Sequence, residues 1–261
     1  LSFDGVDDYV LINSSTSLTP SNNLSIIASV NIENTETTNC IISKGVDSEG
    51  NPPMDYTMSV NYNGCNNLIN AENSGWYQVH TITDINNNTW NNFSMTYDGN
   101  ILKAYFNGNF ENSSEFQYDE GNPINTNLGN INHTDSPLKL GSYNILNQSG
   151  DGNYFNGKMD EIIIYNAEIS AEDLNLNYND GLVPNQNAII AHYKFNAGEG
   201  EILYDHSGNA NHGTINGAIW SDDVYVPPYN GPEWFVSVDG NESNDGSEEL
   251  PFSSIQQAID S

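Results

Sequence analysis

The sequence predicts an all-β protein, built as a two-sheet antiparallel sandwich with one short helix. Apolar and polar residues alternate with a period of two through most of the chain up to about residue 165, which is typical of half-buried strands. Turn-forming Asn, Gly, Ser and Asp residues separate these segments. Aromatic residues make up 11% of the 261 residues, so the chain has enough apolar material for a core.

The expected strands follow one another at short intervals. The clearest local signal is a hairpin in which Asp98-Gly99-Asn100 joins two alternating segments, because Asp-Gly tolerates the positive φ angles of a tight connection. A second turn is expected at Asn107-Gly108. The segments expected to be strands are 3–11, 24–30, 40–45, 56–62, 77–82, 93–97, 102–106, 138–141 and 159–165.

One helix is expected directly after these strands. Ser170 and Asp173 form a capping box, and Ile169 and Leu174 have the spacing of a hydrophobic staple. Gly181 is placed to end the helix in a left-handed conformation. Two further strands, 188–195 and 214–220, are expected beyond it, joined through a polar loop at 205–213.

A change in composition predicts two domains. Pro227-Pro228 and Gly231-Pro232 mark residues 223–233 as a linker. We therefore expect a sandwich over 1–222, closed by its own late strands at 188–220, and a second, truncated domain over 234–261. In that second domain 234–238 reads as a strand and 255–259 as a helical or turn element.

The charge balance excludes two classes of partner. The chain has 35 acidic residues and five lysines, with no arginine, for a formal net charge of −30. Such a surface repels nucleic-acid backbones and anionic lipid headgroups. No apolar run approaches the roughly 18 residues of a membrane span, so we expect no membrane insertion.

Three segments together resemble the laminin-G-like jelly-roll modules of the concanavalin A-like lectin/glucanase superfamily. Residues 1–10 (LSFDGVDDYV) resemble the opening of these modules, 95–108 their central hairpin, and 155–172 their closing strand and helix. Residues 189–220 carry a further motif of this kind, which in many such modules comes first. The resemblance implies a jelly roll in a secreted, extracellular protein associated with the surface of a bacterial cell.

The last segment resembles a different family. Residues 235–260 are similar to the first segment of right-handed parallel β-helix proteins of the pectate-lyase-like type. This resemblance implies that further β-helix rungs follow residue 261.

Catalytic motifs are missing from the sandwich. Related glucanases carry Glu-x-Asp-x-x-Glu or a close variant on one strand, and retaining chemistry needs two carboxylates about 5 Å apart. No segment supplies that pattern. Asp160 and Glu161 are adjacent, so strand alternation is expected to turn them to opposite faces. We therefore expect no enzyme activity within these residues.

Bound calcium is expected to stabilise the module. Calcium prefers oxygen ligands, which the 205–211 loop offers at alternating positions together with a glycine for the bend. In related jelly rolls an Asp of the closing strand is often a calcium ligand, and Asp160 matches that place. The candidate ligands are Asp4, Asp160, Asp205, Asn209 and Asn211. The alternative is that these side chains only cap turns.

Aromatic residues in Asn-rich stretches are candidate platforms for a sugar ring. They are Trp76, Tyr77, Trp90 and Tyr154. The alternative for each is a packed position in the core. The two cysteines, Cys40 and Cys65, are either a disulfide or two separate thiols.

These observations predict a non-catalytic carbohydrate-binding or adhesive module, stabilised by calcium, with glycans or cell-surface polysaccharide as partners. One alternative is a structural spacer without a ligand. The other is an accessory part of a polysaccharide-degrading enzyme whose active site lies in the β-helix.

Overall fold

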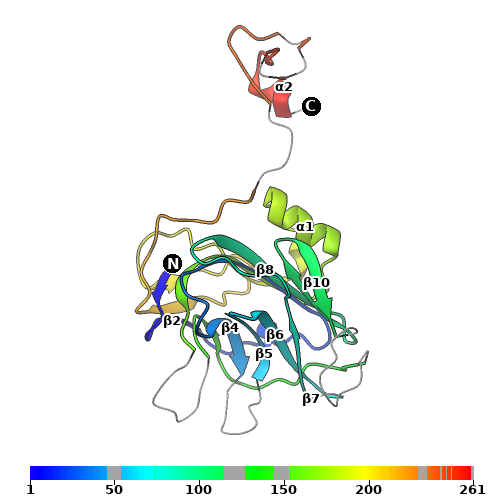
Figure 1. Ribbon diagram of the computed structural model, residues 1–261, viewed down its shortest axis with the longest axis vertical. Helices are drawn as coiled ribbons and strands as arrows, with labels where there is room; N and C mark the ends of the chain where they lie inside the picture. The colour runs from blue at the N-terminus through cyan, green and yellow to red at the C-terminus, as the bar shows by residue number, and fades with distance from the viewer. Residues whose placement is uncertain are drawn as a thin grey trace. The chain divides into compact units, whose positions relative to one another are not determined.

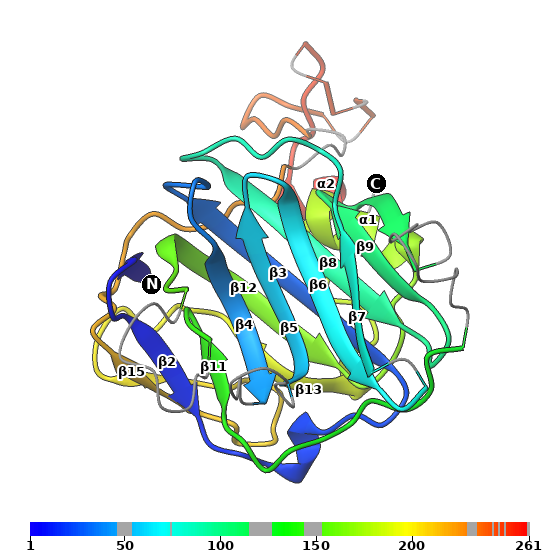
Figure 2. The same ribbon diagram turned by 60° about the horizontal axis from the view of Figure 1, so that its bottom comes forward.

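The computed structural model divides into two compact units, Leu1–Pro227 and Pro228–Ser261. It describes residues 1–45, 54–73, 75–114, 127–143, 153–228, 234–241, 243–244, 246–247 and 249–259. The first unit is a sandwich of two antiparallel sheets (Figures 1 and 2). Its architecture confirms the predicted all-β fold.

The first sheet has the strand order β1-β12-β3-β8-β9-β10, and β13 also pairs with β12. β12 is long enough to pair with β1 at its start and with β13 at its end. Its strands are β1 (Ser2–Asp4), β3 (Leu24–Ile32), β8 (Trp90–Tyr97), β9 (Leu102–Phe106), β10 (Asn109–Ser113), β12 (Asn156–Tyr165) and β13 (Ile189–Tyr193).

The second sheet has the order β14-β15-β2-β11-β4-β5-β6-β7. Its strands are β2 (Tyr9–Ile12), β4 (Asn39–Gly45), β5 (Met54–Asn61), β6 (Gly64–Ala71), β7 (Gly75–His80), β11 (Leu138–Leu140), β14 (Ile202–Leu203) and β15 (Gly213–Asn216). β6 and β10 were not among the expected strands, because their Asn-rich sequences show no clear apolar alternation.

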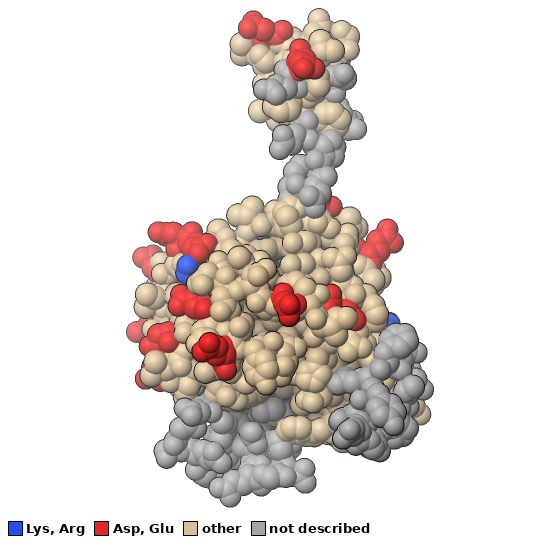
Figure 3. Space-filling model, viewed as in Figure 1, with Lys and Arg blue, Asp and Glu red and all other residues tan. Residues whose placement is uncertain are grey.

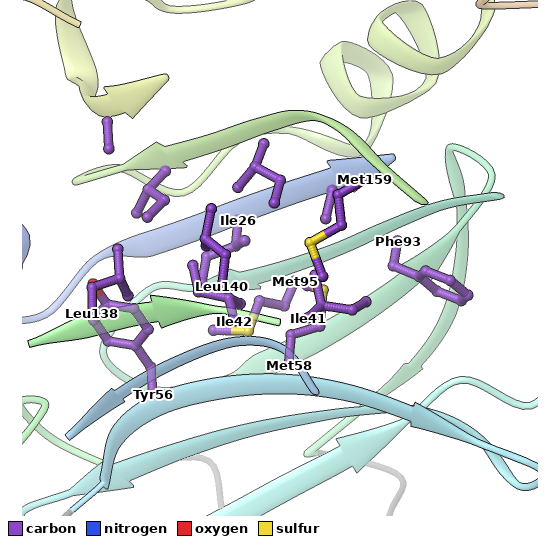
Figure 4. Close-up of a cluster of buried hydrophobic side chains, with 14 of the residues drawn as sticks. Ile26, Ile41, Ile42, Tyr56, Met58, Phe93, Met95, Leu138, Leu140 and Met159 are labelled. Carbon is purple, nitrogen blue, oxygen red and sulfur yellow. The ribbon is translucent and has the colours of Figure 1, made fainter. Parts of the chain in front are cut away.

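The hydrophobic core lies between the two sheets. Ile26 and Met95 from the first sheet meet Ile42 and Met58 from the second, and all four are inaccessible to solvent (Figure 4). Most strands present alternate residues to this core. At the bulge in β4 the consecutive residues Ile41 and Ile42 both belong to it.

The helix α1 (Ala171–Asp180) covers the outer face of the first sheet (Figure 1). The Ser170 hydroxyl oxygen accepts a hydrogen bond from the Asp173 amide at 3.1 Å. Gly181 ends the helix at φ 67°. Ile169 and Leu174 are buried in a second apolar cluster with side chains of β3, β9 and β12. The predicted helix and its staple are confirmed.

The late strands complete both sheets. β13 pairs with β12 in the first sheet, and β15 pairs with β2 in the second. Two short 3-10 helices, Thr16–Leu18 and Gln186–Ala188, lie in the connections.

Residues 223–227 were expected to be linker, but they pack onto the first sheet. The Asp223 carboxylate accepts hydrogen bonds from the Trp90 indole (3.0 Å) and from the Lys158 ammonium (2.6 Å). The Tyr225 amide donates to Asp160 at 2.9 Å, and its hydroxyl donates to the carbonyl of Tyr178. These contacts hold the segment against the sandwich, so a linker that begins at residue 223 is wrong.

The second unit contains the short helix α2 (Ile255–Ile259) and a tilted aromatic pair, Trp234 and Phe252. The strand expected over 234–238 is not formed there, since only Val236 makes an isolated bridge, to Phe252. No helix in the described residues is long and apolar enough to cross a membrane.

Candidate functional site

Trp76 lies on the outer face of β7, an edge strand of the second sheet. On the same strand, Val79 lies in the core and Tyr77 packs against it. Because successive side chains of a strand point to opposite faces, Trp76 and Gln78 point outward. The side chain of Trp76 is 42% exposed. An exposed indole on an edge strand is a flat apolar surface that a partner can stack on.

A row of amide side chains lies beside Trp76. Asn70 is its direct cross-strand partner on β6, and such partners share one face of a sheet. The Asn132 amide group donates to the Asn70 side-chain oxygen at 2.8 Å. The Asn130 amide group donates to the Glu72 carboxylate at 3.1 Å, at the end of the same strand. We call Trp76, Gln78, Asn70 and Asn132 the Trp76 face.

The chemistry of the Trp76 face is that of a flat apolar ring surrounded by neutral donors and acceptors. Each amide side chain offers both a carbonyl oxygen and an NH₂ group. Hydroxyl-rich ligands present the complementary pattern, with apolar ring faces and hydroxyl groups at their edges.

The other three aromatic candidates do not join Trp76. Tyr77 packs against the core and its hydroxyl donates to the carbonyl of Ser114. Trp90 is on β8 of the other sheet, where its ring lies 6.1 Å from that of Tyr225. Tyr154 is half-buried just before β12. The four residues therefore do not form one platform.

Hydrogen bonds to backbone groups of the loop and of β13 hold the Asp205 loop in place. The two carboxylate oxygens of Asp205 accept from the amides of His192, Ser207 and Asn211 and from the Ser207 hydroxyl, all within 2.9 Å. The side-chain amides of Asn209 and Asn211 donate to the carbonyl of Ile190. These contacts match the turn-capping alternative, since donors already occupy the Asp205 oxygens.

Asp160 and Glu161 line the same cavity, which corrects the expectation that they face opposite ways. A β-bulge interrupts the register between Asp160 and Ile162, and Glu161 has φ 42°. The bulge breaks the alternation of side chains at that point. The cavity, of about 420 Å³, lies beside Gly181 and Tyr225.

The acidic groups of this cavity are held by hydrogen bonds. Asp160 accepts from the amides of Tyr225 and Glu161, both at 2.9 Å. Burial raises the pKa of the Asp160 carboxyl against these hydrogen bonds, and the charge of Glu161 raises it further. A carboxylate oxygen of Glu161 lies 2.8 Å from Nε2 of His192.

Asp4 belongs to a cluster that the sequence interpretation recognised only in part. Asp4, Asp7 and Asp8 each offer a carboxylate oxygen, and these oxygens lie within 4.8 Å of one another. Asp8 is buried, which raises the pKa of its carboxyl; the charges of Asp4 and Asp7 add to this effect. Three oxygen donors in one turn suit the coordination chemistry of calcium.

The calcium candidates are thus spread over three places. Asp4 is in the first turn, Asp160 is at the cavity, and Asp205, Asn209 and Asn211 are in their own loop. Asp7 and Asp8 were missed, although they stand next to Asp4 in the sequence.

Cys40 and Cys65 are buried free thiols. Cys40 on β4 pairs with Ser59 of β5, and Cys65 on β6 pairs with the adjacent Val60. Directly paired residues on neighbouring strands point to the same face of a sheet, so Cys40 shares a face with Ser59 and Cys65 with Val60. Ser59 and Val60 are consecutive and point to opposite faces, so the two sulfurs lie on opposite sides of the sheet. The disulfide is therefore not formed, and the alternative of two separate thiols describes the structure.

The comparisons with known proteins agree with this architecture. The family model of the concanavalin A-like lectin/glucanases superfamily matches residues 4–175. No curated relative matches the chain.

Among solved structures, a Bacteroides ovatus protein provisionally described as carbohydrate-binding is 18% identical over 83% of this chain, with a TM-score of 0.57. The match spans 59% of the length of that protein. At this identity the similarity establishes a shared fold.

Two further structures were reported with bound sugars. Domain 4 of an extracellular arabinanase from Geobacillus stearothermophilus, in complex with arabinotriose, is 20% identical over 67% of this chain and 73% of its own, with a TM-score of 0.48. The CBM40 domain of a Ruminococcus gnavus sialidase, bound to sialyllactose, is 14% identical over 67% of this chain and 93% of its own, with a TM-score of 0.48.

Proposed function

The chain belongs to the concanavalin A-like lectin/glucanases superfamily, and from this premise we propose that its sandwich is a non-catalytic module that binds carbohydrate on the Trp76 face. The observation that carries the proposal is the 42% exposed indole of Trp76 beside the hydrogen-bonded amides of Asn70 and Asn132. Aromatic stacking supplies apolar contact area, and the amides supply the directional hydrogen bonds that fix a sugar ring.

The acidic groups support a binding role over a catalytic one. Glycoside hydrolysis by the usual mechanisms needs two carboxyl groups on either side of the scissile bond. Among the described residues, Glu72 is the carboxylate bonded to the amide row, and Glu111 lies beyond the opposite end of the six-residue strand β7, too far away to act on the same glycosidic bond. In the cavity, Asp160 is engaged by two backbone amides and Glu161 by His192.

We further infer that one calcium ion stabilises the module. Asp4, Asp7 and Asp8 would hold it, because their carboxylate oxygens converge within 4.8 Å. Backbone amides bond one oxygen of Asp4 and one of Asp8, whereas both oxygens of Asp160 and of Asp205 accept hydrogen bonds. Bound calcium would offset the repulsion between the three charges and stabilise the first turn.

The proposal places the module outside the cell, in a longer surface-associated or adhesive protein, as the resemblance to secreted bacterial proteins suggests. A β-helix after the sandwich is part of this proposal, with the sandwich as its glycan-binding unit. A module that only spaces other domains would have no need of an exposed tryptophan beside an ordered row of amides.

Binding of the 261-residue chain to immobilised and soluble polysaccharides tests the proposal. We expect quenching or a blue shift of tryptophan fluorescence on binding, and loss of binding in Trp76→Ala with partial recovery in Trp76→Phe. The matched control is Trp90→Phe, on the other sheet, which should bind like the wild type. Absence of binding across a broad panel, or unchanged binding by Trp76→Ala, would contradict the proposed site.

A further inference from the structure

We propose that the Trp76 face selects uncharged glycans and rejects those that carry carboxylate or sulfate groups. The inference rests on the proposed function and names the ligand class of the same site. It follows from the positions of every cationic side chain in the chain, because acidic sugars are recognised mainly by Arg and Lys.

The chain has few arginine and lysine side chains, and the position of each is known. The sequence has no arginine and five lysines, and the structure describes all five. Lys44 is completely buried and bonded to Asp55. Lys103 pairs with Glu168 at 2.7 Å and Lys158 with Asp223 at 2.6 Å, both on strands of the first sheet.

The two remaining lysines lie away from Trp76. Lys139 is on β11 of the same sheet, where its ammonium group lies 4.6 Å from the centre of the Tyr9 ring. β11 and β7 are four strands apart in the sheet order. Four spacings of about 4.8 Å put Lys139 about 19 Å from β7. That distance is about twice the Debye length at physiological ionic strength, so its charge is largely screened at Trp76.

Lys194 belongs to the opposite side of the sandwich. It follows β13 of the first sheet and lines the cavity beside Asp160 and Glu161. The outer face of the second sheet around β5, β6 and β7 therefore carries no lysine.

Carboxylates instead lie at both ends of β7. Glu72 precedes the strand and accepts from Asn130. Glu111 accepts from the amides of Ile82 and Thr83, just after the strand ends. Acidic side chains also far outnumber cationic ones on the face of the molecule shown in Figure 3. His80, at the other end of β7, has the same alternation as Trp76 and Gln78. When histidine is neutral, a negatively charged ligand that approached Trp76 would therefore meet like charge and no lysine or arginine.

Neutral sugars avoid this penalty. Their hydroxyl groups match the donors and acceptors of Asn70, Asn132 and Gln78, and their apolar ring faces match the indole of Trp76. Specificity then comes from the unfavourable charge placed against the wrong ligand as much as from attraction to the right one.

Pairs of glycans that differ mainly in charge test the inference on the 261-residue chain. Suitable pairs are methyl-esterified with unesterified polygalacturonate and the methyl ester of sialyllactose with sialyllactose itself, measured by calorimetry or affinity electrophoresis at pH 8, where histidine is ordinarily neutral. We expect binding to the uncharged member of at least one pair, with its acidic counterpart at least about tenfold weaker at low salt.

Equal or tighter binding of an acidic glycan, lost in Trp76→Ala, would overturn the inference and leave the proposed function standing. Binding of no glycan at all would overturn both.

A gain of function gives an independent test. Gln78→Lys adds one cation beside Trp76 on an exposed position, while Asn109→Lys adds the same charge on β10 of the other sheet. We expect Gln78→Lys to bind polygalacturonate at least about threefold more tightly than Asn109→Lys. Equal affinities of the two variants would show that the missing cation at this face does not set the specificity.

Discussion

The ammonium nitrogen of Lys44 lies 3.1 Å from a carboxylate oxygen of Asp55, and both side chains are completely inaccessible to solvent. The same nitrogen donates to the carbonyls of Thr134 and Ser136, each at 2.9 Å. Asp55 also accepts from the amide of Thr134. The pair thus ties β4 and β5 to the segment that leads into β11.

Removing Lys44 should strongly destabilise the sandwich. Lys44→Ala leaves the Asp55 carboxylate buried without its cation, which typically costs about 3–5 kcal/mol. The matched control, Lys103→Ala, breaks a partly exposed pair with Glu168 and should cost less than about 1 kcal/mol. Urea unfolding of both variants measures the difference; similar losses would contradict the assigned role of the buried pair.

Calcium should raise the melting temperature through the first turn of the chain. At a hundredfold excess over its dissociation constant, one bound ion adds about 2.7 kcal/mol, which is several degrees for a unit of this size. The double variant Asp7→Asn/Asp8→Asn should lose this response.

The double variant Asp84→Asn/Glu199→Gln removes two exposed charges elsewhere and should keep the calcium response. A wild-type melting temperature that is the same in calcium and in chelator would show that the ion does not bind.

Asp160 and Asp55 should change the stability with pH in opposite directions. The raised pKa of Asp160 lies above the unfolded value of about 3.9, so its charged form costs stability at neutral pH. That cost is relieved as the pH falls through the raised pKa. For Asp55, burial opposes ionisation, but hydrogen bonds from His133 and the charge of Lys44 outweigh it and lower the pKa. The stability that Asp55 contributes is therefore present above about pH 3.9 and lost below it.

Melting temperatures from pH 3 to 8, recorded in chelator, measure both contributions. Asp160→Asn should remove a stabilising contribution that grows as the pH falls from neutral through the raised pKa of Asp160. A pH dependence that is identical in wild type and Asp160→Asn would assign the change to other groups.

The two cysteines should be inert in the folded protein. Burial raises the pKa of the Cys40 thiol to about 12 and also raises that of Cys65, so little reactive thiolate forms at neutral pH. A thiol reagent should titrate no cysteine in native buffer and both in denaturant. Reductant should leave the melting temperature unchanged, and absence of reactive thiols in denaturant would instead indicate a disulfide.

The local sequence determined much of the fold. The alternating segments form strands, and Asp98-Gly99 lies in the turn of the β8–β9 hairpin. Ser170 and Gly181 cap the two ends of the helix α1. Each of these features depends on interactions between residues a few positions apart, so a short stretch of sequence carries enough information to predict it. β6 was not predicted, because its Asn-rich sequence has no local strand pattern and its strand conformation comes from pairing with β5 and β7.

The candidate site depended on tertiary structure. Four aromatic residues fitted the sequence pattern, but only the sheet position of each decided that Trp76 is an exposed ring while Tyr77 packs against the core and Trp90 against Tyr225. Asn132 was not a candidate, since it is 62 residues from its partner Asn70.

The sequence by itself determined the strand-rich fold class, the capped helix and the scarcity of cations, because these follow from composition and from local spacing. Only the tertiary structure decided that Asp160 and Glu161 share a cavity, that Cys40 and Cys65 stay apart, and where the five lysines lie. Strand register and a β-bulge set these arrangements, and both arise from pairing between distant segments that no local pattern encodes.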